Sequence, residues 1–405
     1  QDTISKYEKT IRIAKKLFTD KITDQDIEKL NSKKVEYNEK DLRQNAFAKI
    51  IIDSYFVEQF AIPVPDEEFK ENSIITIYKT GVNTVDLMKK IGINILPNNI
   101  IDGTTMLLMP DALSLLYQKA PYLISMSVTD LNSLTKTDFE QLAPQRIYIP
   151  KPGNEPTIGV IDTLFNSNVY FSDWVDYTNM VDPNIEICDD DYFHGTAVTS
   201  IIVDGPSFNR KLDDGCGRFK VRHFGVATGG KFSSFSILKA INEIVTKNKD
   251  IKVWNLSLGS SLEISPNFIS PEAAILDKIQ YDNDVIFIIA GTNKPTDIKG
   301  KMKIGAPADS INSLVVNSVD FKNSPASYSR EGPVLSFFIK PDISYYGGDK
   351  EKIRVCTPTG EAFVSGTSFA APWIARKMSY LIDIMGFDRT TAKAILIDSA
   401  TGWEK

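Results

Sequence analysis

The chain has 405 residues, of which 42% are hydrophobic and 24% are charged, a composition typical of a globular protein with two or three domains. Its formal net charge of −6 argues against nucleic acid or an anionic membrane as the main partner. No apolar run reaches the roughly 18 residues that a transmembrane helix requires, so no membrane partner is expected.

Residues 1–69 are predicted to form a helical, highly charged N-terminal segment. Apolar residues recur at helical spacing in ISKYEKTIRIAKKLF, and either Thr23 or Asp24 can cap a second helix, TDQDIEKL. A longer helix is expected in NEKDLRQNAFAKIIIDSYFVEQF. The two prolines of AIPVPDEEF then interrupt the helical pattern.

Residues 70–131 are predicted to form a small α+β domain. The strands are expected in SIITIYKT, NILPNN, TTMLLMP and LISMSV, and the helices in GVNTVDLMKKIGI and DALSLLYQKAP. The resulting order, β-α-β-β-α-β, is that of a ferredoxin-like split unit. Residues 132–154, which contain YIPKPGNEP, are predicted to be a linker.

Residues 155–405 alternate strands with helices. Short β-branched runs such as TIGVIDTLF, FKVRHFGVAT, IKVWNLSLG and DVIFIIAGTN are separated by amphipathic helical stretches. This pattern predicts an α/β fold with a doubly wound, mostly parallel sheet and helices on both faces. In such a sheet, functional residues gather at the carboxyl ends of the strands.

Three polar residues stand at such positions, and each has a structural alternative. Asp162 ends the strand GVID, where it could equally form a turn or cap a helix. His194, in DDDYFHGTAVTSII, stands at a loop-to-helix junction before a glycine that allows close approach, although a lone histidine is usually structural. Ser368, in SGTSFAAP, lies among small residues in the first turn of a helix, where serine is also a common N-cap.

Together the three residues indicate nucleophilic catalysis. A serine becomes a good nucleophile when a histidine takes its proton and an aspartate holds that histidine in the right tautomer. The chain has only two histidines, and His223 lies in the middle of a strand, so His194 is the credible base. The order Asp162, His194, Ser368 excludes an α/β-hydrolase, in which the histidine follows the serine of a GxSxG motif. A chymotrypsin-like order would need an aspartate after His194 and a β-barrel pattern, which the helices contradict.

The three motifs resemble those of the subtilisin-like serine proteases. IGVIDT resembles the family's Asp motif, HGTAVTSII its His motif and SGTSFAAPWIA its Ser motif. The resemblance extends over roughly residues 155–400, through SPASYSREGP and AKAILIDSA. It implies the subtilisin-like fold and hydrolysis of a protein or peptide substrate, with Ser368 as nucleophile, His194 as general base and acid, and Asp162 orienting His194.

The resemblance also implies Asn293 as the side-chain donor of an oxyanion hole. The family usually carries this asparagine in an AAGN sequence after a strand, whereas here the sequence is IIAGTNKP, with Thr292 between Gly291 and Asn293. Either the turn carries an extra residue or the loop is re-registered, and a simple turn asparagine is the alternative. The second donor would be the backbone N–H of Ser368, at a helix N-terminus.

The same resemblance suggests where an extended peptide would bind. The segments SLG and TGGKF are similar to the two strands between which the family binds its substrate by backbone hydrogen bonds. The alternative for both is a core strand end followed by a turn. The residues expected to bind substrate are Gly230, Ser257, Leu258, Gly259, Gly291 and Thr367.

No metal or cofactor is predicted. Extracellular members of the family often bind calcium, but no matching loop follows the helix of His194, where PSFNRKLDDGCGRF stands. Asp213 and Asp214 in this stretch are interpreted as a solvated turn. The three cysteines are far apart and form no CxxC pair, which favours a reducing compartment and hence a cytoplasmic location. Because the chain begins with Gln1, a removed N-terminal signal is the alternative.

Residues 73–130 resemble, in pattern rather than in any motif, the propeptide that assists folding and blocks the cleft in subtilisin-like proteases. The chain is continuous through this region and keeps all three candidate catalytic residues, so we hypothesise that residues 1–150 are a retained regulatory region able to bind a partner protein. Two other hypotheses stay open. One is a silent or latent module that binds peptides, and the other is a protease that makes a limited cut in one partner.

Overall fold

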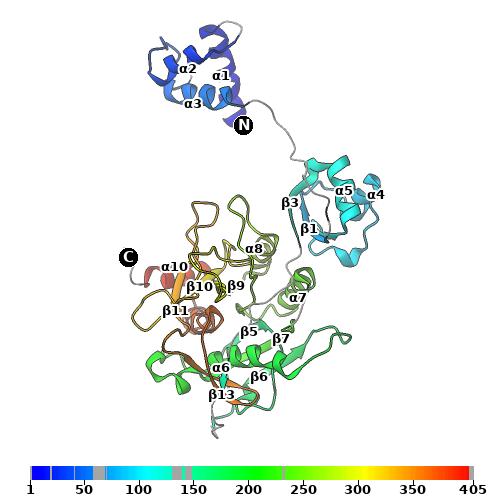
Figure 1. Ribbon diagram of the computed structural model, residues 1–405, viewed down its shortest axis with the longest axis vertical. Coiled ribbons are helices and arrows are strands. Elements are labelled where there is room, and N and C mark those ends of the chain that lie inside the picture. Colours follow the sequence, from blue (N-terminus) through cyan, green and yellow to red (C-terminus); the bar gives the residue numbers. More distant parts are fainter. Residues whose placement is uncertain are drawn as a thin grey trace. The chain divides into compact units, whose positions relative to one another are not determined.

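The computed structural model describes residues 2–18, 21–40, 42–57, 69, 71–129, 139–141, 148–229 and 233–400 (Figure 1). The chain divides into two compact units, Gln1–Asp66 and Glu67–Lys405. Among the described residues, no helix is long and apolar enough to cross a membrane.

The first unit contains the three predicted helices, α1 (Asp2–Leu17), α2 (Asp24–Asn31) and α3 (Gln44–Tyr55). Of the two candidate caps, Thr23 is the one used: its side chain and that of Asp26 form a reciprocal capping box at the start of α2. The helices bury one small apolar core, made of Ile13, Ile27, Leu30, Phe47 and Ile51.

The second unit begins with the small α+β domain. Its elements are β1 (Ser73–Ile77), α4 (Thr84–Ile91), β2 (Thr105–Leu108), α5 (Pro110–Lys119) and β3 (Ile124–Thr129). The strands form an antiparallel sheet in the order β2-β1-β3. The predicted strand in NILPNN is wrong, because Pro97–Asn99 forms a short 3₁₀ helix instead. Proline lacks the N–H that a strand ladder needs.

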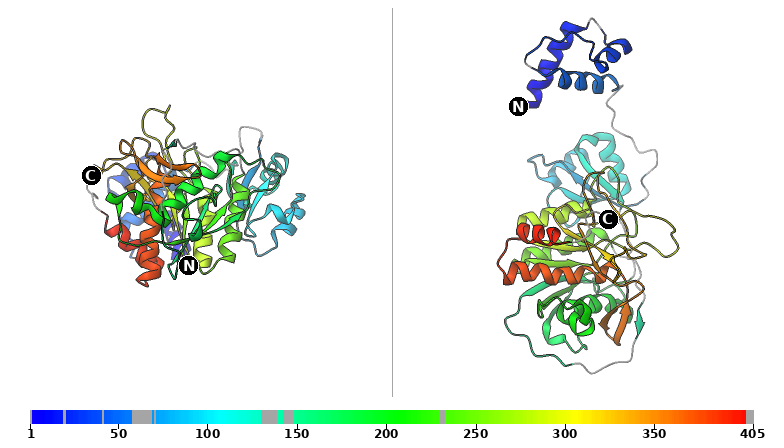
Figure 2. Two further views of the ribbon diagram at one scale, coloured as in Figure 1. Left: turned by 90° about the horizontal axis from the view of Figure 1, so that it is seen from below. Right: turned by 90° about the vertical axis from the view of Figure 1, so that its left-hand side faces the viewer.

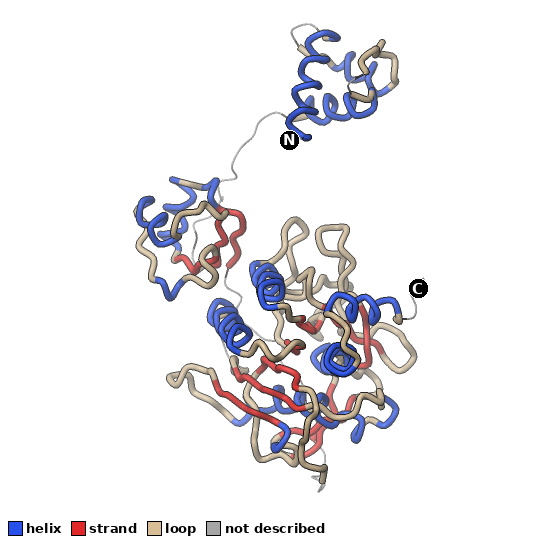
Figure 3. Tube along the Cα trace, turned by 180° about the vertical axis from the view of Figure 1, so that it is seen from behind, coloured by secondary structure: helices blue, strands red, loops and turns tan. Residues whose placement is uncertain are grey.

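The larger part of the second unit is built on one large sheet with helices around it (Figures 1 and 3). The sheet has seven strands, and all neighbouring strands are parallel, as predicted. The strand order is β11-β10-β9-β8-β5-β7-β6. The strands are β5 (Thr157–Asp162), β6 (Val175–Asn179), β7 (Lys220–Gly225), β8 (Val253–Leu256), β9 (Ile286–Ala290), β10 (Leu314–Val319) and β11 (Ile343–Tyr346). The large helices are α6 (Phe193–Phe208), α7 (Ser234–Lys247), α8 (Pro271–Asn283), α9 (Ala371–Ser379) and α10 (Arg389–Asp398).

Helices cover both faces of this sheet (Figure 2). Successive strand residues point to opposite faces, so Val160 joins the core of α6 and α9 while Ile161 joins the core of α7 and α8. This alternation explains why the sheet strands are apolar at nearly every position.

The α+β domain packs on α7 and α8. Both β1 and β3 contact α8, and Ile74 of β1 is buried in the same core as residues of these helices. At the edge of the contact, Lys278 forms an ion pair with Asp102, with 2.9 Å between Nζ and Oδ2, and Lys239 donates to the carbonyl of Asn98.

Three strands outside the main sheet were not predicted. The hairpin β12 (Ile353–Thr357) and β13 (Gly360–Val364) leads directly to Ser368, and the two-residue strand β4 (Glu140–Gln141) pairs with β13. The segment predicted as a plain linker therefore contains a strand. The strands β6 and β11 of the main sheet were also not predicted.

The interpretation of Asp214 as part of a solvated turn is wrong. Its carboxylate is fully buried and accepts two hydrogen bonds, at 2.8 and 2.9 Å, from the equally buried guanidinium of Arg376 in α9. This bidentate pair holds the loop before β7 against α9.

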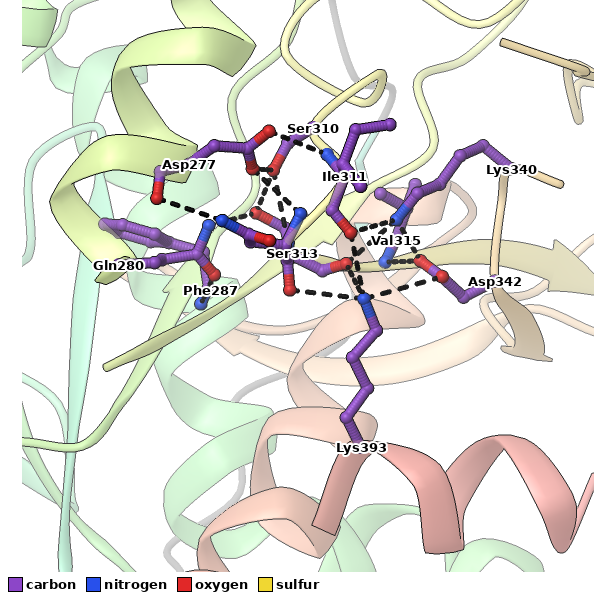
Figure 4. A network of polar contacts seen from close by, with 11 residues as sticks. Asp277, Gln280, Phe287, Ser310, Ile311, Ser313, Val315, Lys340, Asp342 and Lys393 are labelled. Carbon is purple, nitrogen blue, oxygen red and sulfur yellow. Dashed lines mark hydrogen bonds and ion pairs between the residues drawn. The ribbon is translucent and has the colours of Figure 1, made fainter. Parts of the chain in front are cut away.

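A second buried polar network attaches the C-terminal helix α10 to the sheet (Figure 4). Lys393 of α10 donates to the carbonyls of residues 311–313 at 2.8 to 3.2 Å. Lys340 donates to the carbonyl of Ser313 at 2.9 Å and to Asp342 at 2.7 Å. The loop before β10 therefore depends on two lysines for its carbonyl acceptors.

Candidate active site

The end of β5 and the start of α6 bring Asp162 and His194 together. Oδ1 of Asp162 lies 2.6 Å from Nδ1 of His194 and accepts a second hydrogen bond, at 2.7 Å, from the amide of Thr163. The Asp162 carboxylate is fully buried, whereas 18% of the His194 side chain is exposed. With Nδ1 held by the carboxylate, Nε2 is the nitrogen of His194 left for proton transfer.

Gly195 makes this approach of α6 to β5 possible. A Cβ atom at this position would lie 2.6 Å from the carbonyl oxygens of both Thr163 and Leu164. The Gly195 amide instead donates to the Thr163 hydroxyl at 2.9 Å. The glycine that follows His194 in the sequence therefore allows the close packing that places the imidazole beside Asp162.

Two opposing effects act on the pKa of His194. Burial lowers it, but the charge of Asp162 and its hydrogen bond together outweigh burial, so the pKa of His194 is raised above 6.5. The carboxylate thus stabilises the imidazolium that forms when His194 accepts a proton.

The other histidine, His223, has a structural environment, as expected. It is completely buried in β7, with Nδ1 2.9 Å from the Thr199 hydroxyl and Nε2 2.8 Å from the Thr163 carbonyl. Burial lowers the pKa of His223, which favours the neutral ring, and both of its nitrogens have hydrogen-bond partners.

Ser368 lies in a short 3₁₀ helix, Thr367–Phe369, directly before α9. Its hydroxyl donates to the carbonyl of Ser257 at 3.3 Å, and the Ser257 hydroxyl donates back to the carbonyl of Ser368 at 3.1 Å. The side chain of Ser368 caps neither helix, so the N-cap alternative is not what the structure shows. The ring of Phe369, the next residue, lies 5.7 Å from the His194 ring, so the segment that carries Ser368 packs against the histidine.

Asn293 lies against the loop that carries Ser368. Its Oδ1 accepts hydrogen bonds from the amide and the hydroxyl of Thr367, both at 3.0 Å. Because an amide N–H can donate only to the oxygen, this contact fixes the orientation of the side-chain amide and turns Nδ2 away from Thr367. Neither this Nδ2 nor the backbone N–H of Ser368 donates to any other described residue, so both are available as donors.

Thr292, which separates Asn293 from the expected glycine, adopts the left-handed conformation with a φ of +65°. A glycine usually occupies such a position, and a β-branched residue there is strained. Thr292 thus stands where the AAGN pattern has its glycine, and the turn needs no extra residue. Its hydroxyl donates to the carbonyl of Gly291 at 2.6 Å and accepts from the amide of Gly305 at 2.9 Å.

The residues expected to bind substrate lie in different environments. Ser257 contacts Ser368 directly, and Leu258 and Gly259 line a mostly apolar pocket between β8, α7 and α8. Gly291 continues the pairing of β9 with β10 through its amide, and Thr367 orients Asn293. Gly230 lies outside the described residues. The other residues that line the pocket are Ser234, Ile237, Leu238, Ile241, Leu256, Ser260, Glu272, Leu276, Ala306 and Pro307.

The strand β4 lies beside the candidate catalytic residues. Its register with β13 pairs Glu140 with Phe363 and Gln141 with Ala362. The ring of Phe139, just before β4, lies 5.5 Å from that of Phe193 and 6.4 Å from that of Phe369. These two phenylalanines are the direct neighbours of His194 and Ser368 in the sequence.

Thr163, Thr292 and Arg330 contact the site without having been predicted to do so. Thr163 follows Asp162 directly, and its position in the motif is the only sequence signal for it. Arg330 contacts the backbone of Asn293 from far along the chain, and no local pattern indicates it. In the described part of the chain, no group of three or more histidine, cysteine or acidic side chains is arranged to hold a metal ion.

Comparison with known proteins gives a consistent result. The sequence model of the subtilase family matches residues 153–404. Subtilisin-like protease 2 of Pseudogymnoascus destructans is 29% identical over 171 residues, which cover 42% of this chain and 38% of that protein. Alkaline protease 1 of Emericella nidulans is also 29% identical, over 40% of this chain and 38% of its own length. The matched region thus spans about two fifths of the length of these relatives.

Among solved structures, a mutant of the epidermin leader peptide processing serine protease from Staphylococcus aureus has a similar fold. It aligns with a TM-score of 0.57 at 18% identity, over 80% of this chain and 92% of that chain. Residues 153–404 make up less than two thirds of the present chain, so this alignment extends into the region before them. The likeness supports the same fold and covers part of the N-terminal region.

Proposed function

This chain belongs to the subtilase family, and we propose that it is a serine endopeptidase that cleaves peptide bonds through an acyl-enzyme. The observation that carries the proposal is the joint placement of a buried Asp162–His194 pair, the Ser368 hydroxyl and two free N–H donors at one edge of the sheet. No single one of these features would suffice, because each has an ordinary structural use.

In the first step, His194 accepts the proton of Ser368 while the serine oxygen attacks the carbonyl carbon of the substrate. The Ser368 hydroxyl donates to the Ser257 carbonyl, so it must first turn toward Nε2 of His194. Asp162 holds His194 through Nδ1 and stabilises the imidazolium. The same histidine then gives the proton to the leaving amine, and a water molecule repeats the sequence to release the acyl group.

The negative oxygen of the tetrahedral intermediate would be bound by Nδ2 of Asn293 and the backbone N–H of Ser368. Thr367 supports this role because it fixes the amide orientation of Asn293. Preorganised donors of this kind stabilise the transition state more than the substrate, which is why they accelerate the reaction. These steps use only side chains and backbone groups of the protein together with water, so we propose that a chelator leaves the rate unchanged.

The proposal is tested with a fluorophosphonate probe and a peptide library. We expect Ser368-dependent labelling and cleavage by the wild-type chain and neither by Ser368→Ala. Absence of labelling in the wild type would favour the alternative, a silent or latent subtilisin-like module that binds peptides. A broad cleavage profile would count against limited cleavage of one partner.

We also propose that the region before the catalytic part regulates it. The packing of the α+β domain on α7 and α8, and the pairing of β4 with the hairpin that leads to Ser368, support this role. Mass spectrometry of the purified chain tests whether the region is retained. A prompt, Ser368-dependent cut near residues 130–155 would contradict retention.

The unpaired thiols support a reducing compartment, and we propose a cytoplasmic location on this ground. Cys188, Cys216 and Cys356 are all free, and Cys188 is exposed. Fractionation of the source cells, with an antibody against residues 153–404, tests the proposal, and recovery outside the cytoplasm would contradict it.

A further inference from the structure

A completely enclosed arginine holds the loop of Asn293. Arg330 is only 1% exposed, and its guanidinium donates only to backbone carbonyl oxygens among the described residues. Nε donates to the carbonyl of Asn293 at 3.0 Å, and Nη2 to that of Ser261 at 2.6 Å. Nη1 lies 3.4 Å from the carbonyls of both Leu262 and Lys303.

This environment differs from that of the other large buried arginine. Arg376 forms a bidentate ion pair with the buried Asp214, whereas no described carboxylate forms an ion pair with Arg330. Burial lowers the pKa of Arg330, with Glu263 opposing this effect at longer range. A buried charge without an ion-pair partner is costly, so the hydrogen bonds to the four backbone carbonyls must offset this cost.

Arg330 joins the loop of Asn293 to two other segments, one of which follows Ser257. The Asn293 carbonyl is part of the same residue whose side chain supplies the oxyanion donor, and Ser261 and Leu262 follow the segment that begins with Ser257. The backbone of Arg330 is itself fixed, because Asn317 donates to its carbonyl at 2.8 Å. The amide of Lys294 donates to the carbonyl of Tyr328 at 2.8 Å, which holds the two loops together.

The conformation of the residue before Asn293 shows why this loop needs the hydrogen bonds of Arg330. Thr292 is held in the strained left-handed conformation, which costs about 1–3 kcal/mol for a residue other than glycine unless its surroundings impose it. The Thr292 methyl lies against Gly259, where a Cβ atom would approach it to 2.6 Å. Contacts on both sides of the turn, through Thr292 and through Arg330, therefore determine where the Asn293 amide points.

We infer that Arg330 is a positioning residue for the oxyanion donor, which it places by holding the backbone carbonyl of Asn293. The inference rests on the proposed peptidase function and adds to it a residue that does not touch the substrate. Loss of the hydrogen bond from Arg330 to the Asn293 carbonyl should weaken binding of the transition state. It should leave binding of the substrate in its ground state largely unchanged.

The test is a double-mutant cycle with Arg330→Lys, Arg330→Met, Asn293→Ala and the two combinations. Activities are normalised to the active sites titrated by a fluorophosphonate, so that only folded, competent molecules count. For both Arg330 variants we expect kcat to fall by about 10- to 100-fold with KM changed less than about twofold. In the Asn293→Ala background the same changes should cost less than about threefold, because the donor that Arg330 positions is already absent.

A second measurement separates this role from simple destabilisation. A peptide aldehyde, which forms a tetrahedral adduct with the serine, should lose affinity in proportion to kcat/KM, while a non-cleavable peptide of the same sequence should not. Arg376→Lys is the matched control, because Arg376 is equally buried but donates to Asp214, Ile202 and Gly217 and not to Asn293. It should lower the temperature of unfolding and leave kcat per titrated site unchanged.

The outcomes are distinct. Additive losses in the cycle, or full kcat in Arg330→Lys and Arg330→Met, would overturn the role of Arg330 and leave the peptidase function in place. A wild-type chain with no Ser368-dependent turnover would overturn the peptidase function, and the positioning role with it.

Discussion

At the scale of single residues, the candidate site depends on which atom each side chain already shares with a neighbour. Nδ1 of His194 is held by Asp162, and Oδ1 of Asn293 is held by Thr367. Each of these contacts leaves the opposite nitrogen, Nε2 or Nδ2, free for the reaction. The residues behind the site therefore determine the direction in which the reactive atoms point.

The charge of Asp162 should set the pH dependence of the activity. Catalysis needs neutral His194, so a pKa raised above 6.5 moves the acid limb of kcat/KM above pH 6.5 in the wild type. In Asp162→Asn only burial acts on His194 and lowers its pKa, so the acid limb of kcat/KM should move below pH 6.5. The same substitution should lower kcat by about 10⁴-fold.

The measurement is a pH–rate profile of both proteins, with the exposed Asp176→Asn as the control that should keep the wild-type midpoint. An unchanged midpoint in Asp162→Asn would show that Asp162 does not control the ionisation of His194.

Substitution of Asn293 should lower kcat more than substitution of Thr367. Removing the donor in Asn293→Ala should lower kcat by about 10²- to 10³-fold. Thr367→Val removes one of two hydrogen bonds to Oδ1 and keeps the backbone one, so its loss should be smaller, about two- to tenfold. Steady-state kinetics measure both, and Thr178→Val, in exposed β6, should show no loss. Equal losses for Thr367→Val and Asn293→Ala would contradict this order.

At the scale of elements, strand ends and the helices that follow them bring distant residues together. Asp162 ends β5, Ser257 follows β8 and Asn293 follows β9, and these parallel strands all end at the same edge of the sheet. α6 and the turn before α9 add His194 and Ser368 at that edge. Outside the main sheet, β4 pairs with the hairpin β12–β13, which leads to Ser368.

The placement of Phe139 predicts that β4 obstructs the site. Phe139→Ala removes the ring that packs on Phe193 and Phe369, so the rate of fluorophosphonate labelling should rise severalfold. Tyr148→Ala is the matched control, because Tyr148 is 92% exposed in the same connecting region, and its labelling rate should equal that of the wild type. Equal rates for all three proteins would mean that this contact is only structural.

The lysine network predicts a contribution of α10 to stability. Lys393→Met removes three hydrogen bonds to backbone carbonyls. Lys340 still donates to the carbonyls of Ile311 and Ser313, so among the described residues only the carbonyl of Asn312 loses its donor. We expect the loss of these charge-assisted hydrogen bonds to cost about 1–3 kcal/mol. Thermal unfolding followed by circular dichroism should show a lower midpoint for this variant. Lys247→Met, at an exposed position of α7, should unfold at the same midpoint temperature as the wild type. Unfolding of Lys393→Met at the wild-type temperature would show that other groups replace the ammonium.

At the scale of the whole molecule, the chain consists of two units with separate cores. The core of the helical unit contains only residues between Ile13 and Ile51, whereas the α+β domain shares buried side chains with the catalytic part. Shared burial stabilises both partners, so the α+β domain and the catalytic part should unfold together.

A chain that begins at residue 67 should therefore keep its fold and its activity. We expect the same kcat/KM and a temperature of unfolding within about 2 °C for the second unit, since residues 67–405 form a compact unit by themselves. Kinetics and calorimetry measure both quantities. A large loss of stability would show that residues 1–66 contribute to the core of the second unit.

The sequence alone determined most of the main sheet and the identity of the candidate catalytic residues. Buried parallel strands carry continuous apolar runs, which are visible in any single chain, and the motifs around Asp162, His194 and Ser368 are local. The positions that local patterns did not determine were the short or exposed strands β4, β6 and β11, the hairpin, and the strand wrongly expected at Pro97.

Only the tertiary structure decided how the Asn293 loop is held. The threonine at the glycine position of the turn was visible in the sequence, but its left-handed conformation depends on contacts with Gly305 and Gly259. Arg330 and Asp214 look like surface residues in the sequence, yet both are enclosed. The physical reason is that burial and hydrogen bonding of a charged side chain depend on segments that are distant in the chain and meet only when it folds.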